Sequence, residues 1–183
     1  MPDPAMNAIQ QLLNTPEPAA LGPGRRSGAL SETALGAKLE ELIRPTNLPT
    51  AKQQLIRALL LLWHDHLDAS HAISQGIENA DGSYVHAIMH RREPDFWNSE
   101  YWFRRVGKHP CFPELAKRAT ALMESRSESA LLNKLVQAGQ WDAFAFVDAC
   151  KEASAGGGEK QVLLREIQKI EFEVLLEHFL KGA

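Results

Sequence analysis

The sequence predicts an all-α protein, a single-domain helical bundle of about seven to eight helices with a flexible N-terminal tail. Apolar residues recur three and four positions apart through residues 31–44, 51–78 and 159–180. Runs that alternate apolar with polar residues are scarce, so strands are not expected. No internal repeat and no long heptad pattern occurs, which argues against a solenoid and an extended coiled coil.

The chain opens with a segment rich in Pro, Gly and Ala, residues 1–30, which we expect to be a flexible tail with at most a short helix around Ile9. A single helical domain is expected over residues 31–183. Ser31 is a candidate N-cap for its first core helix, which should end at the "RPTNLP" segment, residues 44–49.

A long helix is expected over residues 51–78, where two adjacent apolar stripes indicate deep burial. The turn formers of "ENADGS" end it, and a second arm over 82–92 completes a helical hairpin. Pro94 stops that arm near residue 93 and suits the first turn of a further helix to about residue 105. The remaining helices are expected at 113–123, 128–138, 141–153 and 159–180.

Composition limits the class of function. The 183 residues are 44% apolar and 23% charged, as in a soluble globular chain that buries its own core. A net charge of −3 and a pI near 6.2 make nucleic acid an unfavourable partner. The chain lacks a signal-peptide pattern, and its longest apolar run is too short to span a membrane, so a cytoplasmic location is expected. Cys111 and Cys150 are expected to be free structural thiols, although a nucleophilic Cys111 is conceivable.

Histidines are concentrated in the expected hairpin, with five of the seven between residues 64 and 90. On each arm two histidines and one carboxylate share a helix face: His64, Asp68 and His71, then His86, His90 and Glu93. A rise of about 1.5 Å per residue places His71 level with His90, and Asp68 level with Glu93, across the turn. These four residues are the expected core of a site, flanked by His64 and His86.

Such a set of imidazoles and carboxylates is a competent first shell for zinc, iron or manganese. Its alternative is a buried polar network without metal. Known metal motifs are not met. "HAIMH" at 86–90 lacks the glutamate of a zincin, and His64 has no upstream histidine as the HD phosphohydrolases require. The order His90-x-x-Glu93 reverses that of a ferritin-like di-iron helix.

Aromatic rings and arginines are interleaved in the same part of the chain. A small anionic ligand could be walled and anchored by Tyr84, Arg91, Arg92, Trp97, Tyr101 and Arg104. The alternative assigns the rings to the core and pairs the arginines with neighbouring carboxylates. Single-stranded nucleic acid is less favoured, because its binders usually add a basic surface.

The stretches "WHDHLDASH" and "DGSYVHAIMHRREPDFWNSEYWFRRVG" resemble a family of uncharacterised small proteins, chiefly bacterial. The resemblance covers about residues 60–110 and implies no activity. Two hypotheses follow from the residues. The first is a protein that binds a divalent metal or a small anion; as an enzyme it would catalyse hydrolysis or oxidation, with Asp68 or Glu93 as ligand or base and Arg91 or Arg92 as anion anchor. The second is a non-catalytic module with a structural histidine network, whose aromatic patch docks a partner or a second copy.

Overall fold

The computed structural model describes residues 4–154 and 158–181, and these residues are mostly helical. The helices are α1 (Pro4–Gln11), α2 (Glu32–Ile43), α3 (Thr50–Trp63), α4 (Leu67–Ser74), α5 (Ala80–Arg92), α6 (Phe96–Val106), α7 (Phe112–Ser125), α8 (Ser129–Leu135), α9 (Ala143–Ser154) and α10 (Glu159–Leu180). The strands β1 (Val136–Gln137) and β2 (Gln140–Trp141) form one antiparallel hairpin. The all-α prediction is therefore confirmed, but the expected seven to eight helices is wrong, since the described residues contain ten.

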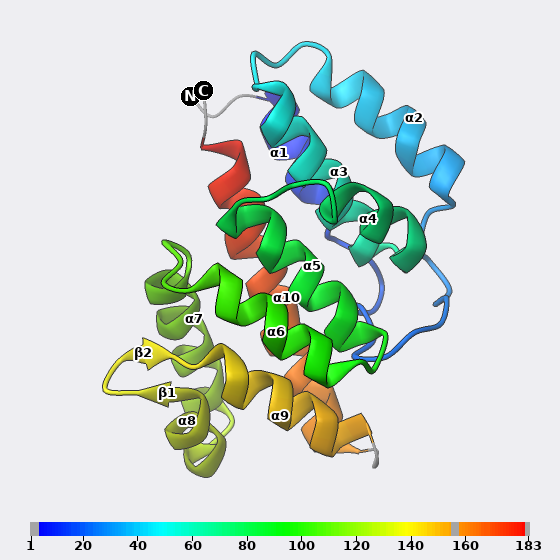
Figure 1. Cartoon of the computed structure of the whole chain (residues 1–183). Coiled ribbons are helices and arrows are strands. Elements are labelled where there is room, and N and C mark those ends of the chain that lie inside the picture. The colour runs from blue at the N-terminus through cyan, green and yellow to red at the C-terminus, as the bar shows by residue number, and fades with distance from the viewer. Residues whose placement is uncertain (1–3, 155–157, 182–183) are drawn as a thin grey trace.

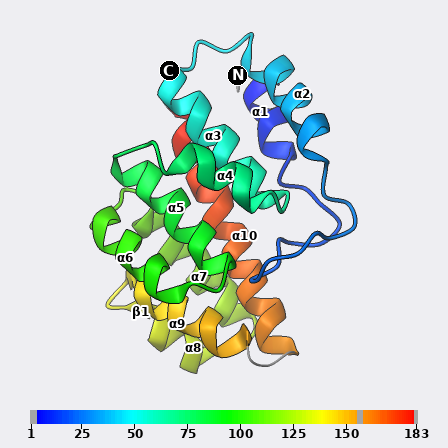
Figure 2. The same cartoon turned by 45° about the vertical axis from the view of Figure 1, so that its right-hand side comes forward.

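Helix α10 runs through the middle of the bundle and is flanked by α1, α3, α7 and α9 (Figures 1 and 2). Its buried residues, from Leu163 to Leu180, lie on several sides of the helix, as expected for a helix covered all round. Two of them are polar, Gln168 and Glu171, and both find partners inside the protein. None of the described helices combines the length and the apolar character needed to cross a bilayer.

The long helix expected over 51–78 is wrong, because it is broken into α3 and α4 at residues 64–66. Asp65 has a positive φ of 69° there. At the break, His64 and His66 turn toward the N-terminal segment and form hydrogen bonds with it. His64 accepts the Leu30 N–H at Nδ1 (3.1 Å) and donates from Nε2 to the Leu12 carbonyl (3.0 Å). His66 Nε2 lies 2.8 Å from the Leu30 carbonyl oxygen.

The segment expected to be a flexible tail is packed onto the bundle over its described part, and we call residues 12–30 the N-terminal strap. The apolar side chains of Ile9, Leu13, Ala19 and Leu21 are buried against the core. Polar groups fix the strap further: Arg26 pairs with Asp65 (3.0 Å), Arg92 donates to the Ala20 carbonyl (2.8 Å) and Gln168 donates to the Ala19 carbonyl (3.0 Å). The short helix expected around Ile9 is α1.

Local signals explain several element ends. Ser31 caps α2 by accepting the Ala34 N–H (3.2 Å), as expected. Helix α5 is capped by Asn79, whose side chain accepts the Gly82 N–H (2.8 Å). A side chain on Gly82 would place its Cβ 2.2 Å from the Ile77 carbonyl oxygen. The helix expected over 128–138 ends early, because Ala138 and Gly139 both adopt positive φ and form the turn of the β-hairpin.

Candidate metal centre

Helix α5 positions most of the candidate ligands, and it is buried from Gly82 to Arg92. It packs between α3, α4 and α6, with α6 running alongside it (Figure 1). Polar side chains on this helix are therefore removed from water wherever they point. Each of these side chains either has a hydrogen-bond partner, binds an ion, or remains unsatisfied.

Three histidines meet where α4 crosses α5. His71 comes from α4, and His86 and His90 lie one turn apart on α5. One potential ligand nitrogen of each lies within 4.8 Å of those of the other two. The ring centroids of His71 are 4.7 Å from His86 and 5.4 Å from His90. We call His71, His86 and His90 the three-histidine cluster.

His86 is the least satisfied member of this cluster. Its side chain is buried, with the residue only 3% exposed, and neither ring nitrogen has a hydrogen-bond partner among the described residues. Burial, together with the neighbouring His90 and His71, lowers the pKa of His86 to about 3. The ring is therefore neutral near pH 7 and presents a free lone pair, as a metal ligand must.

His90 is oriented by its neighbours. Its Nδ1 lies 3.1 Å from Glu93 Oε2, and the Asn98 amide nitrogen lies 3.1 Å from its Nε2. A Nδ1–H donated to Glu93 makes Nε2 the acceptor of the Asn98 amide N–H, so a metal ion at Nε2 would take the place of Asn98 while Glu93 continued to orient the ring. Burial lowers the pKa of His90, while the Glu93 carboxylate opposes that shift.

An aromatic wall holds the imidazoles in place. The Trp102 ring from α6 stacks on His86, with centroids 4.0 Å apart and planes 23° apart. His86 in turn stacks on His90, with centroids 4.8 Å apart. Arg105 covers Trp102, its guanidinium carbon 5.2 Å from the ring centroid. The ring positions are thus fixed by packing, and hydrogen bonding plays little part at His86.

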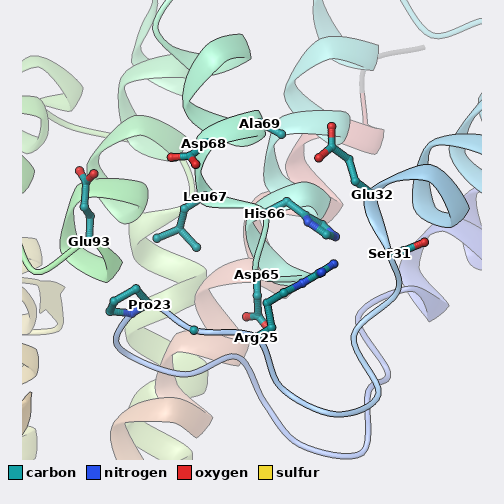
Figure 3. Close-up of a pocket in the computed structure, with 11 residues that line it drawn as sticks. Pro23, Arg25, Ser31, Glu32, Asp65, His66, Leu67, Asp68, Ala69 and Glu93 are labelled. Carbon is teal, nitrogen blue, oxygen red and sulfur yellow. The ribbon is translucent and has the colours of Figure 1, made fainter.

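A pocket of about 630 Å³ adjoins the cluster at Glu93, which contacts His90 and also lines the pocket. We call it the acidic pocket. Figure 3 shows Glu93 at one end of it, Glu32 at the other and Asp68 between them. Neither Asp68 nor Glu32 forms an ion pair within the described part of the chain, and Arg25 is the cation on the wall. These charges favour a cation over an anion.

The structure brings together some of the sequence-predicted ligands and separates others. His71 and His90 meet as expected, and His86, expected only to flank, is a full member of the cluster. Asp68 lines the acidic pocket one turn from His71 but lies outside the cluster. His64 is elsewhere, since the break after α3 turns it toward the strap.

The arginines expected to anchor an anion are occupied in the core. Arg91 is fully buried and bonds to Glu171 and Gln168 of α10. Arg92 is equally buried; its Nη2 lies 2.7 Å from Asp65, and burial lowers its pKa to about 10. Neither guanidinium is free to meet a ligand.

The aromatic members of the expected ligand wall are also scattered. Tyr84 is fully buried and packs against Phe103. Trp97 and Tyr101 lie on the outer face of α6, 73% and 41% exposed, with their rings stacked 6.3 Å apart. Arg104 is exposed and pairs with Glu100 one turn away. None of the six residues of the expected ligand wall lines the acidic pocket.

Sequence reasoning missed a second group, the Asp81 cluster, formed by Asp81, His109, Cys111, His178 and Lys52. Asp81 Oδ1 accepts from the Nε2 atoms of His109 (3.0 Å) and His178 (2.9 Å), and its Oδ2 lies 3.3 Å from the Lys52 ammonium. The Cys111 N–H donates to His109 Nδ1 (3.2 Å), so the ring hydrogen of His109 is on Nε2. Burial opposes ionisation, but the His109 hydrogen bond and the Lys52 charge lower the pKa of Asp81 to about 2.

The Asp81 cluster also has three potential metal ligands within 4.8 Å of one another, in His109, Cys111 and His178. A metal at His109 Nε2 would replace the hydrogen bond to Asp81. The ring hydrogen would then move to Nδ1 and break the bond from the Cys111 N–H as well. Burial raises the pKa of the Cys111 thiol to about 12, and does the same at Cys150. Neither thiol is a thiolate at neutral pH, so a nucleophilic role for Cys111 loses its basis.

Comparison with protein-family models, with curated proteins and with solved structures finds no match to this chain. Its function has to be inferred from the geometry of its own side chains.

Proposed function

We propose that this protein binds a divalent transition metal ion through His71, His86 and His90. The observation that carries the proposal is His86, a buried imidazole between two others with both nitrogens unpartnered among the described residues. Burying a polar group without a partner costs about 1 to 3 kcal/mol. An ion at the centre of the three rings would supply the missing interaction.

The donor set limits the ion. Three imidazoles suit zinc or iron, with positions left over for water or a substrate, whereas manganese would need carboxylate ligands as well. Glu93 fits the role of a carboxylate that holds a ligating histidine by its other nitrogen. Calcium and magnesium are disfavoured, because they prefer oxygen ligands.

The acidic pocket adjoins the cluster at Glu93 but is lined by none of the three histidines, so a small molecule in it would approach the ion from the side of that carboxylate. If the ion is catalytic, in hydrolysis or oxidation, Asp68 and Glu93 are the carboxylates of that pocket that could accept a proton. The buried arginines do not reach the pocket, so a small anion would depend on the metal and on Arg25 for its charge partner. Metal binding is therefore the better-supported part of the hypothesis.

An interaction module is the second candidate, and the exposed Trp97–Tyr101 pair on α6 favours it. Such a surface would dock a partner or a second copy without need of a metal. Metal content separates the two functions.

The test is metal analysis of untagged protein by plasma mass spectrometry, together with thermal melts with and without EDTA. We expect about one equivalent of metal per chain and a melting temperature that chelator lowers. Apo protein reloaded with Co²⁺ should show visible d–d absorption bands of nitrogen coordination. Protein that neither retains nor takes up metal, and melts identically in EDTA, would leave only the interaction function.

A further inference from the structure

A second pocket, of about 600 Å³, lies where the loop after α6, the start of α7 and the β-hairpin meet. Figure 1 shows the hairpin leading directly into α9 beside α7. Four aromatic side chains line this aromatic pocket, which shares no residue with the acidic pocket: Phe103, Phe112, Trp141 and Phe144.

Two of these side chains have a part that nothing in the described structure covers or bonds. Phe144, in the first turn of α9, is 40% exposed, although it is large and apolar. The indole N–H of Trp141 is buried and has no acceptor within the described residues. A ligand with an apolar body would cover Phe144, and flat rings prefer to stack on such walls.

The polar lining shows which charge the ligand should carry. Lys108 is exposed at the pocket and forms no ion pair among the described residues. The Asp142 carboxylate is already engaged, since it accepts the Ala145 N–H at the start of α9 (2.9 Å). His109 is held by Asp81 on its other side. Asp142, like Lys108, has no ion-pair partner among the described residues, but its carboxylate caps α9, so the charged group of the lining that is free of hydrogen bonds is the Lys108 ammonium.

We propose that the aromatic pocket is a binding site for a small aryl carboxylate, with its ring among the four aromatic side chains and its carboxylate paired with Lys108. The arrangement matches the usual pattern of ligand sites, mostly apolar walls with a few polar groups that fix orientation. The proposed anion site differs from the one that the sequence suggested. The sequence suggested aromatic rings and arginines between residues 84 and 105, whereas the aromatic pocket is lined by four rings and Lys108 between residues 103 and 144.

The test is an NMR titration of ¹⁵N-labelled full-length protein, following the indole N–H signal of Trp141, assigned with the Trp141→Phe variant. The probes are 3-phenylpropionate, 3-phenylpropan-1-ol and 3-phenylpropan-1-amine, which share a shape and differ in charge. We expect saturable shifts of the Trp141 signal with 3-phenylpropionate, with a Kd on the order of 1 mM, and weaker binding of the alcohol and then the amine.

Charge variants make the result decisive. Lys108→Glu should weaken 3-phenylpropionate binding at least tenfold and strengthen binding of the amine. Lys117→Glu is the matched control, because Lys117 is exposed on α7 and does not line the pocket; it should leave all three affinities unchanged. Absence of any saturable shift, or equal affinity for the three probes, would overturn the proposal.

Discussion

The three-histidine cluster and the Asp81 cluster both bring imidazoles within reach of one another inside the bundle, but only the second has a carboxylate at its centre. Asp81 receives two imidazole N–H groups and a lysine. Among the described residues, the carboxylate in contact with the three-histidine cluster is Glu93, which lies at the edge and takes one ring nitrogen of His90, while Asn98 takes the other. Both nitrogens of His86, in contrast, are left without a partner.

Proximity alone does not identify a metal site. In both clusters three potential ligand atoms lie within 4.8 Å of one another. What separates them is one ring: His109 uses both nitrogens, as His90 does, whereas His86 uses neither among the described residues. The metal site that we propose is therefore the cluster with the unpartnered ring, which we call open, and the hydrogen bonds of the closed Asp81 cluster favour a structural role for it.

The largest expected effect is on metal binding. His86→Leu should weaken metal affinity at least about 100-fold, or about 2.7 kcal/mol, because it removes a ligand from the middle of the cluster. The unfolding free energy of the metal-free chain should not fall by more than about 1 kcal/mol, since no hydrogen bond is lost. Competition with a metal indicator and urea unfolding in EDTA measure the two quantities.

The control for that experiment is His178→Leu in the Asp81 cluster, which should keep full metal affinity. If both variants lose metal equally, or neither does, the distinction between an open and a closed cluster does not hold.

Next in size is the stability of the closed cluster. Asp81→Asn should lower the unfolding free energy by about 2 kcal/mol at pH 7, because three donors lose a charged acceptor. Metal affinity should not change. Urea unfolding measures the loss, and Asp148→Asn, an exposed aspartate on α9, serves as control with an expected change within about 0.5 kcal/mol. A similar loss in both variants would remove the special role of Asp81.

The pH dependence of that loss sharpens the same comparison. The pKa of Asp81 falls from 3.8 to about 2 on folding, so its stabilisation is complete above about pH 4 and disappears as the pH falls through 2. The gap of about 2 kcal/mol between the parent chain and Asp81→Asn should therefore close between pH 4 and pH 2. Urea midpoints at pH 6, 4, 3 and 2 follow it, and a gap that stays constant would show that the Asp81 charge contributes nothing.

The fold could be predicted from sequence where signals are local. The last helix, 159–180, agrees with α10 at both ends, and the stop near Pro94 separates α5 from α6. The break at residues 64–66 contains neither Gly nor Pro and could not be seen locally. Its cause lies more than thirty residues away in the chain, in the carbonyl and amide groups of the strap that His64 and His66 bind.

The candidate site could likewise be predicted only where its residues are close in sequence. Spacing on a continuous helix placed His86, His90 and Glu93 on one face, and a short turn brought His71 to His90. His64 was misplaced because its helix ends before it. The Asp81 cluster had no comparable signal, because its members come from segments far apart in sequence and only packing around α10 brings them together.

The smallest effect tests how the open cluster is oriented. Glu93→Gln should weaken metal affinity about tenfold, or about 1.4 kcal/mol, because the amide holds His90 Nδ1–H less strongly than a carboxylate does. Glu32→Gln removes the same charge from the same pocket without touching a histidine, and should change affinity less than about twofold. Indicator competition at fixed pH compares the two. Equal losses would mean that Glu93 acts only through the charge of the pocket, and an unchanged affinity in Glu93→Gln would mean that packing by Trp102 alone orients the rings.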